Sequence, residues 1–219
     1  MAGAEDLSLD DLRRRLAPAV AAAAAFDGWS GEAVRAAAES TGVDPDVAAF
    51  AFRDGAMAMI AAWIETVDAR MAAALPAEAL AALPVRERIR RLVLCRLEAV
   101  AGLEESLRRA LAVMAMPRNA PRALKLGWQS ADAMWRLAGD RATDFNHYSK
   151  RAILAGVYAA TLAVFVDDAS EGKRDTHAFL DRRLEGIIRF ETAKRQWLRP
   201  SEERFSMARF LGRLRYPAS

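Results

Sequence analysis

Apolar residues recur at spacings of three and four along most of the chain, and residues that start or stop helices separate these stretches at helix-length intervals. The clearest single face belongs to a segment ending near residue 137 and is formed by Leu124, Trp128, Ala131, Trp135 and Ala138. Such spacing is typical of amphipathic helices, and alternating strand patterns are almost absent. The sequence therefore predicts an all-α fold.

The first third of the chain predicts three short helices. Ser8, Ser30 and Asp44 are residue types that cap helix N-termini, and Pro45 follows Asp44 in a first helical turn. Gly42 lies in the turn between the second and third helices. This arrangement has the shape of a helix-turn-helix.

The charge of this region argues against DNA binding. Between residues 27 and 60 there are six acidic residues and two arginines, and Asp44 and Asp46 start the helix that would face the phosphates. Phosphate contacts require hydrogen-bond donors, so acidic side chains in this position repel DNA. We expect a retained scaffold with no DNA partner.

The segment after Gly139 and Asp140 predicts a long helix capped by Thr143 or Asp144. The run Ala152–Val166 holds fifteen uncharged residues, fewer than the roughly 20 that a membrane-spanning helix needs. We expect a helix at the centre of a bundle, with its buried seam formed by Phe145, Tyr148, Ala152, Ala155, Ala159, Leu162 and Val166.

Catalytic and metal chemistry have little support in the sequence. The two histidines, His147 and His177, lie thirty residues apart without metal-ligand spacing, and no nucleophile-elbow, P-loop or dinucleotide-binding motif is present. The single cysteine, Cys95, lies in an apolar run and is expected to be a structural thiol. We expect a non-enzyme without metal or cofactor, with His147 as a general base as a remaining alternative.

The C-terminal segment has the composition of a basic amphipathic helix. Residues 194–219 contain seven cations and two acids. A Pro-Ser break at Pro200 separates the final part of this segment from the preceding helix. Such a helix binds a membrane interface with its apolar side down, or docks on protein. The residues expected at the membrane are Phe205, Phe210, Leu211, Leu214, Arg204, Arg209 and Arg213.

Aromatic and polar residues crowd the first turns of the long helix. Phe145 and Tyr148 fit its buried seam, whereas Asn146, His147 and Arg151 are expected on another face. Aromatic residues together with arginine are typical of protein-binding hot spots. The start of this helix is therefore a candidate partner surface.

A resemblance to a known family lies in the run Asp132–Lys194, DAMWRLAGDRATDFNHYSKRAILAGVYAATLAVFVDDASEGKRDTHAFLDRRLEGIIRFETAK. Its pattern W-x-x-AGD-x-x-TDFN-x-Y-x-x-RA-x-LA-x-VY, followed by DT-x-AFL-x-RR, resembles the ubiquinone-biosynthesis accessory family, the ninth coenzyme Q protein (Coq-nine). The resemblance implies a TetR-like helical bundle, with an N-terminal helix-turn-helix unit (residues 1–53), C-terminal ligand-binding helices (54–198) and a final amphipathic helix (199–219).

The resemblance also implies a homodimer that binds an isoprenoid or quinone lipid at a membrane and presents it to the di-iron demethoxyubiquinone hydroxylase. The expected lipid-lining residues are Trp128, Trp135, Leu154, Tyr158, Leu162 and Phe165. The expected hydroxylase-facing residues are Met134, Asp144, Asn146, His147, Tyr148 and Arg151.

One position departs from the family, which often has tryptophan where this chain has His147. Histidine keeps a flat ring but buries less area and can become charged, so the partner surface can differ here. The N-terminus resembles no presequence, which favours a bacterial form at the cytoplasmic face of the inner membrane, or a mature mitochondrial chain. The alternative function is a TetR-like transcriptional regulator with a small-molecule pocket.

Overall fold

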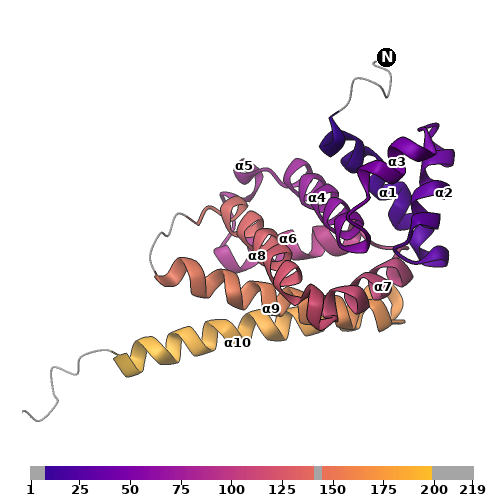
Figure 1. Cartoon of the computed structure of the whole chain (residues 1–219). Coiled ribbons are helices and arrows are strands. Elements are labelled where there is room, and N and C mark those ends of the chain that lie inside the picture. Colours follow the sequence, from indigo (N-terminus) through magenta and orange to yellow (C-terminus); the bar gives the residue numbers. More distant parts are fainter. Residues whose placement is uncertain (1–7, 141–144, 199–219) are drawn as a thin grey trace, which may run out of the picture. The chain divides into compact units, whose positions relative to one another are not determined.

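The structure is a computed structural model that describes residues 8–140 and 145–198. This part of the chain holds ten α-helices, two short 3-10 helices and no strand, as the helical spacing predicts (Figure 1). The helices are α1 Leu9–Asp27, α2 Gly31–Thr41, α3 Pro45–Ala51, α4 Ala56–Ala74, α5 Ala77–Leu80, α6 Val85–Glu98, α7 Glu104–Ala115, η2 Pro117–Asn119, α8 Ala120–Leu137, α9 Phe145–Asp167, η3 Glu171–Lys173 and α10 Arg174–Leu198. The chain divides into two units, residues 1–182 and 183–219.

Side-chain caps fix the starts of the first three helices at the predicted positions. The Ser8 hydroxyl accepts from the Asp11 N–H at 3.2 Å, the Ser30 hydroxyl from the Glu32 N–H at 3.2 Å, and the Asp44 carboxylate from the Asp46 N–H at 2.8 Å. Gly42 ends α2 with φ of 68°, a left-handed conformation that glycine adopts without a steric cost. Local sequence signals therefore determine these helices.

Buried tryptophans join the N-terminal helices to the rest of the first unit. The Trp29 ring lies 5.4 Å from the Trp63 ring of α4, and its indole N–H donates to the Ser106 carbonyl of α7 at 3.0 Å. The Ser106 hydroxyl in turn donates to the Ala21 carbonyl of α1 at 2.6 Å. These bonds satisfy polar groups that the packing removes from water.

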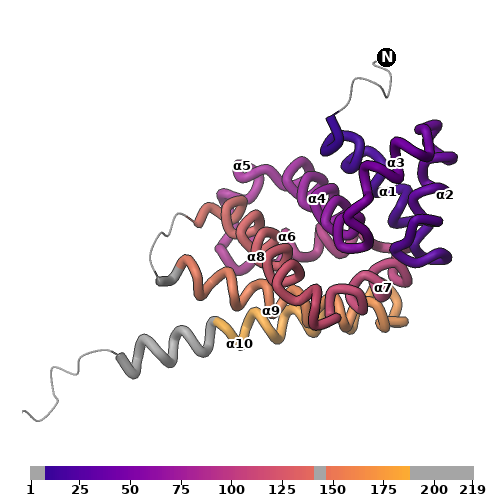
Figure 2. The backbone as a smooth tube through the Cα atoms, viewed as in Figure 1, coloured from indigo at the N-terminus to yellow at the C-terminus, as the bar shows by residue number. Residues whose placement is uncertain are grey.

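Helices α4, α6, α7, α8 and α9 form the rest of the first unit, and Figure 2 follows the chain through them. Their core is built from large apolar side chains that are nearly inaccessible, among them Ile60, Met71, Leu92, Val93 and Met134. The short helix α5 lies in the segment between Pro76 and Pro84.

The buried face of α9 differs from the predicted seam. Tyr148 is 61% exposed, and Ala152 and Ala159 are also exposed. The buried positions are instead Arg151, Leu154, Tyr158, Thr161 and Phe165, which also follow a spacing of three and four. The seam prediction was wrong because both faces of this helix are apolar and spacing alone cannot choose between them.

The face of α8 differs in a similar way. Leu124, expected on the apolar face, is 75% exposed. The buried residues of α8 are Leu126, Ser130, Ala131 and Met134.

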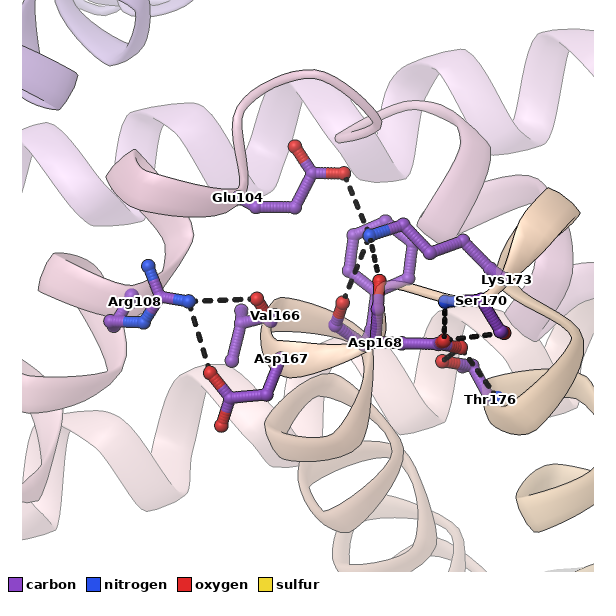
Figure 3. A network of polar contacts seen from close by, with 9 residues as sticks. Glu104, Arg108, Val166, Asp167, Asp168, Ser170, Lys173 and Thr176 are labelled. Atoms are coloured by element: carbon purple, nitrogen blue, oxygen red, sulfur yellow. Dashed lines mark hydrogen bonds and ion pairs between the residues drawn. The ribbon is translucent and has the colours of Figure 1, made fainter.

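A polar network fixes the turn between α9 and α10 (Figure 3). The Asp168 carboxylate accepts from the Ser170 hydroxyl at 2.5 Å and from the Thr176 hydroxyl at 2.6 Å, and also from both backbone N–H groups. Desolvation raises the pKa of Asp168, but these four hydrogen bonds lower it by more, so the net pKa lies well below the ordinary value. Thr176 lies in the first turn of α10, so the network joins the turn to the start of that helix.

Among the described residues, α9 from His147 to Asp167 is long and apolar enough to cross a membrane by length and composition, and the bent pair α3–α4 meets the same criterion across a 90° break. The core helix of a soluble protein meets this criterion too. Only 33% of the α9 span is buried within the structure.

Candidate lipid and partner site

The hairpin of α8 and α9 is held by a buried arginine. Arg151 is 2% exposed, and its Nε donates to Asp132 of α8 at 2.6 Å. One terminal nitrogen donates to Asp140 at 3.1 Å and to the His147 carbonyl at 3.1 Å. Lys150 also pairs with Asp140, at 2.8 Å. Desolvation raises the pKa of Asp140. The hydrogen bonds from Lys150 and Arg151 lower it by more, so the net pKa lies below its ordinary value.

This burial corrects the expectation that Arg151 is an exposed contact residue. Its guanidinium is enclosed by carboxylates of its own chain, and Met134, another expected contact, is fully buried. Neither side chain is accessible to a partner in the isolated chain. Arg151 can influence a partner surface only by holding the start of α9 against α8.

Three aromatic side chains of α8 and α9 contact one another near the start of α9, and Tyr148 is the exposed one. We call Trp128, His147 and Tyr148 the aromatic patch: the Tyr148 ring lies 5.9 Å from Trp128 and stands edge-on to His147 at 5.2 Å. Leu124, one turn before Trp128 on α8, adds exposed apolar surface. Exposed aromatic residues in contact with one another are typical of protein-binding surfaces.

Several expected site residues lie outside the described part of the chain. Asp144 is one of them, and the side chain of Asn146 is not described either. The expected membrane residues of the C-terminal segment, Phe205, Phe210, Leu211, Leu214, Arg204, Arg209 and Arg213, are outside as well.

The expected lipid-lining residues lie on α8 and α9. Three of their aromatic rings each make a cation–π contact with a lysine or arginine side chain. Lys150 Nζ lies 5.4 Å from the Trp135 ring, the Arg96 guanidinium 4.8 Å from Tyr158, and Lys173 Nζ 4.7 Å from Phe165. Leu154 is buried, whereas Trp128 and Leu162 are partly exposed. These rings therefore present a face to a cation, a feature that the apolar spacing does not predict.

A buried polar cluster lies at Tyr158. We call Arg96, Asp68, Ser130 and Tyr158 the Arg96 cluster. A terminal nitrogen of Arg96 pairs with Asp68 of α4, and the other donates to the Ser130 hydroxyl of α8 at 3.1 Å. The Ser130 hydroxyl also donates to Asp68 at 3.3 Å. Four helices thus meet at one guanidinium.

The Arg96 cluster is incompletely satisfied. Arg96 is 2% exposed, and its Nε is the one inaccessible side-chain nitrogen or oxygen without a hydrogen-bond partner in the described part of the chain. An unsatisfied buried donor costs about 1–3 kcal/mol, and more when it is charged. Such atoms are rare in native structures, so the unpaired Nε calls for an explanation.

A cavity of about 410 Å³ lies elsewhere, between α1 and α4. None of the expected lipid-lining residues borders it. Its lining is mostly charged or small: Asp10, Arg13, Arg14, Asp54, Ala58, Ala61, Ala62, Glu65 and Arg122. Its polarity does not suit an isoprenoid chain.

Sequence patterns did not predict three of the site residues: Asp132, Asp140 and Arg96. Each is a charged residue within a helical segment or at its end, and charged residues on the surface of a helix look the same in the sequence. Arg96 had one available signal, because it interrupts the apolar run LVLCRL. No group of three or more histidine, cysteine, aspartate or glutamate side chains able to hold a metal ion occurs among the described residues.

Comparison with known proteins gives a consistent result. The COQ9 family model matches residues 120–191. Ubiquinone biosynthesis protein COQ9 of rat is 35% identical over 175 residues, covering 76% of this chain and 56% of that protein. The human protein of the same name is 32% identical, covering 85% and 61%, and COQ9-B of Xenopus laevis is 30% identical, covering 86% and 67%. This chain belongs to the COQ9 family.

The region matched by the COQ9 model includes α8, α9 and much of α10. It therefore contains the aromatic patch and the ion pairs of Arg151 and Lys150 with Asp132 and Asp140, which we call the Arg151 network. The chain spans less than two thirds of the length of the rat and human COQ9 proteins, which are named as mitochondrial.

A solved structure shares the fold. The TetR transcriptional regulator of Nitrosomonas europaea matches with a TM-score of 0.63 and 24% identity, covering 80% of this chain and 97% of that chain. This likeness confirms the predicted TetR-like all-α architecture of this COQ9 family member.

Proposed function

We propose that this chain is a non-catalytic accessory protein of ubiquinone biosynthesis. In this role it binds an isoprenoid or quinone intermediate among its helices and presents it at a membrane to the di-iron demethoxyubiquinone hydroxylase. Membership of the COQ9 family supports the place in ubiquinone biosynthesis. The finer parts of the proposal rest on the chemistry of α8 and α9.

The observation that carries the proposal is the position of the aromatic patch. It lies inside the residues matched by the family model, and Tyr148 is 61% exposed in the isolated chain. Exposing a large aromatic side chain forgoes the stabilisation that burial would give. A partner that covers the patch would recover that stabilisation.

The partner interaction can be tested with two exposed aromatic residues. Tyr148→Ala should weaken binding to the purified hydroxylase by about tenfold or more, because hot-spot truncations cost about 2 kcal/mol. Phe26→Ala is the matched control, since Phe26 is 85% exposed on α1, outside the patch. Affinity would be measured by calorimetry, and equal affinity of both variants and the parent would contradict the proposed partner surface.

The lipid-binding role can be tested on the purified full chain. Native mass spectrometry and organic extraction should recover an isoprenoid or quinone lipid that co-purifies with the protein. A preparation that neither retains such a lipid nor binds one on addition would remove the carrier role.

The membrane role is proposed for residues 199–219, whose basic and apolar composition suits an anionic interface. Deleting them should abolish sedimentation with anionic vesicles while circular dichroism shows the helical content of the remainder. Undiminished sedimentation would assign the membrane contact to another part of the chain.

The location and assembly are proposed by analogy. The COQ9 relatives are named as mitochondrial, which supports a mitochondrial site. For a bacterial chain we propose the cytoplasmic face of the inner membrane. The proposed homodimer would give twice the chain mass in light scattering, and a monomer at all concentrations would exclude it.

A further inference from the structure

Arg96 lies beside Tyr158, one of the residues proposed to line the lipid. Its guanidinium lies 4.8 Å from the Tyr158 ring, and Leu154 precedes Tyr158 by one turn on the buried face of α9. Both residues belong to the expected lipid lining. The polar atoms of the Arg96 cluster therefore lie beside the part of this face that Leu154 and Tyr158 form.

Two hydrogen-bonding groups in this cluster have unused capacity. Arg96 Nε has no partner, although both terminal nitrogens of the same side chain are bonded. The Tyr158 hydroxyl is bonded to no other described residue and is not cut off from water, although the residue as a whole is only 7% exposed. One ligand oxygen near Arg96 can accept from Nε, and the tyrosine hydroxyl can serve a second polar atom.

The charges of the cluster determine what kind of oxygen fits. Asp68 already neutralises Arg96, so the cluster carries no net charge. A carboxylate or phosphate bound here would add an unpaired negative charge in a buried position, which is strongly unfavourable. A neutral acceptor such as a ring carbonyl or a phenol oxygen satisfies Nε without that penalty.

We infer that Arg96 binds the ring oxygen of a neutral quinone or phenol head group through Nε and thereby selects such lipids over fatty acids and phospholipids. The inference rests on the proposed lipid-binding function and names the head-group class and the residue that recognises it. Asp68 and Ser130 act as positioning residues, because they hold the two terminal nitrogens and direct Nε away from them.

The test compares three probes that each carry a ten-carbon chain, delivered in the same mild detergent: decyl-ubiquinone, decanoate and decylbenzene. The full chain should bind decyl-ubiquinone about tenfold more tightly than either other probe, as measured by calorimetry. Equal affinity for decyl-ubiquinone and decylbenzene, or tighter binding of decanoate, would overturn the inference while leaving lipid binding intact. Binding of none of the three would overturn the proposed lipid function and the inference with it.

Two further measurements assign the effect to Arg96. Arg96→Lys keeps the positive charge beside Asp68 but removes Nε, so the tenfold preference for the quinone should disappear while decylbenzene affinity stays unchanged. If that variant fails to fold, the ¹⁵N-labelled parent chain decides the question. An arginine Nε–H resonance should shift with decyl-ubiquinone and not with decylbenzene, and an unshifted set of Nε–H resonances would overturn the assignment.

Discussion

At the scale of single residues, burial changes the meaning of a charge. Arg151 and Arg136 both pair with Asp132, at 2.6 and 3.0 Å. Arg151 has a side chain that is 2% exposed, whereas that of Arg136 is 70% exposed. A surface ion pair is screened by water, but removal of one partner of a buried pair leaves an uncompensated charge.

These two arginines give a matched prediction. Arg151→Ala should lower the free energy of unfolding by about 3–5 kcal/mol, because Asp140 loses a buried partner. Arg136→Ala should cost less than about 1 kcal/mol. Urea denaturation followed by circular dichroism measures both, and similar costs would show that the Arg151 network is not what holds the α8–α9 hairpin together. A charge reversal such as Arg151→Glu is unsuitable as a probe of partner binding, because it would disrupt these buried ion pairs.

Asp168 gives a prediction for pH. Because its pKa is lowered in the folded chain, it contributes stability that is present above the unfolded-state pKa of about 3.9 and is lost as pH falls toward the folded-state pKa. Asp168→Asn should therefore be destabilising near pH 7, and its difference from the parent should shrink below about pH 4.

The neighbouring Asp167 serves as the control for this measurement. Its side chain is 77% exposed and pairs with Arg108 at 3.0 Å, so Asp167→Asn should change the unfolding free energy little at any pH. A cost for Asp168→Asn that persists unchanged at low pH would argue against its ionised network (Figure 3).

At the scale of elements, helix existence was predictable and helix rotation was not. Capping residues fixed the starts of α1, α2 and α3, since a cap acts within a few residues of its own position. The rotation of α9 depends on which of two apolar sides meets α8 and α7. Arg151 lies on the buried side because it pairs with Asp132 and Asp140. No local sequence pattern connects these two residues to Arg151.

Adjacent residues test the observed rotation of α9. Leu154 is 2% exposed and Ile153 is 38% exposed. Leu154→Ala should lower the free energy of unfolding by about 2–5 kcal/mol, because it leaves a cavity in the core. Ile153→Ala should cost clearly less, and the reverse order in a thermal or urea melt would contradict the observed rotation of α9.

At the scale of the whole molecule, a TetR-like fold carries acidic residues at the start of α3. The TetR regulator of Nitrosomonas europaea shares the architecture, but Asp44 caps α3 and Asp46 follows it. Val47 and Phe50, which are 45% and 51% exposed, are the large apolar side chains of that helix. The architecture sets the position of α3, and we predict that its acidic residues repel a phosphate backbone.

The chain should accordingly show no salt-dependent affinity for duplex DNA between about 50 and 200 mM salt in fluorescence polarisation. The double variant Asp46→Lys with Asp54→Lys is the comparison, because both side chains are exposed and neither caps a helix through its carboxylate. It should bind more than the parent at low salt. Tight, salt-sensitive binding by the parent would revive the regulator alternative.

The sequence by itself determined the helical class, the helix boundaries near caps and prolines, and the family pattern around α8 and α9. These follow from interactions between residues a few positions apart. Tertiary packing alone decided that Tyr148 is exposed, that Arg151 is buried, and that Arg96 joins four helices with Nε unpaired. Burial and ion pairing depend on which distant helices meet, and the same arginine in the same local pattern lies on the surface or in the core depending on those neighbours.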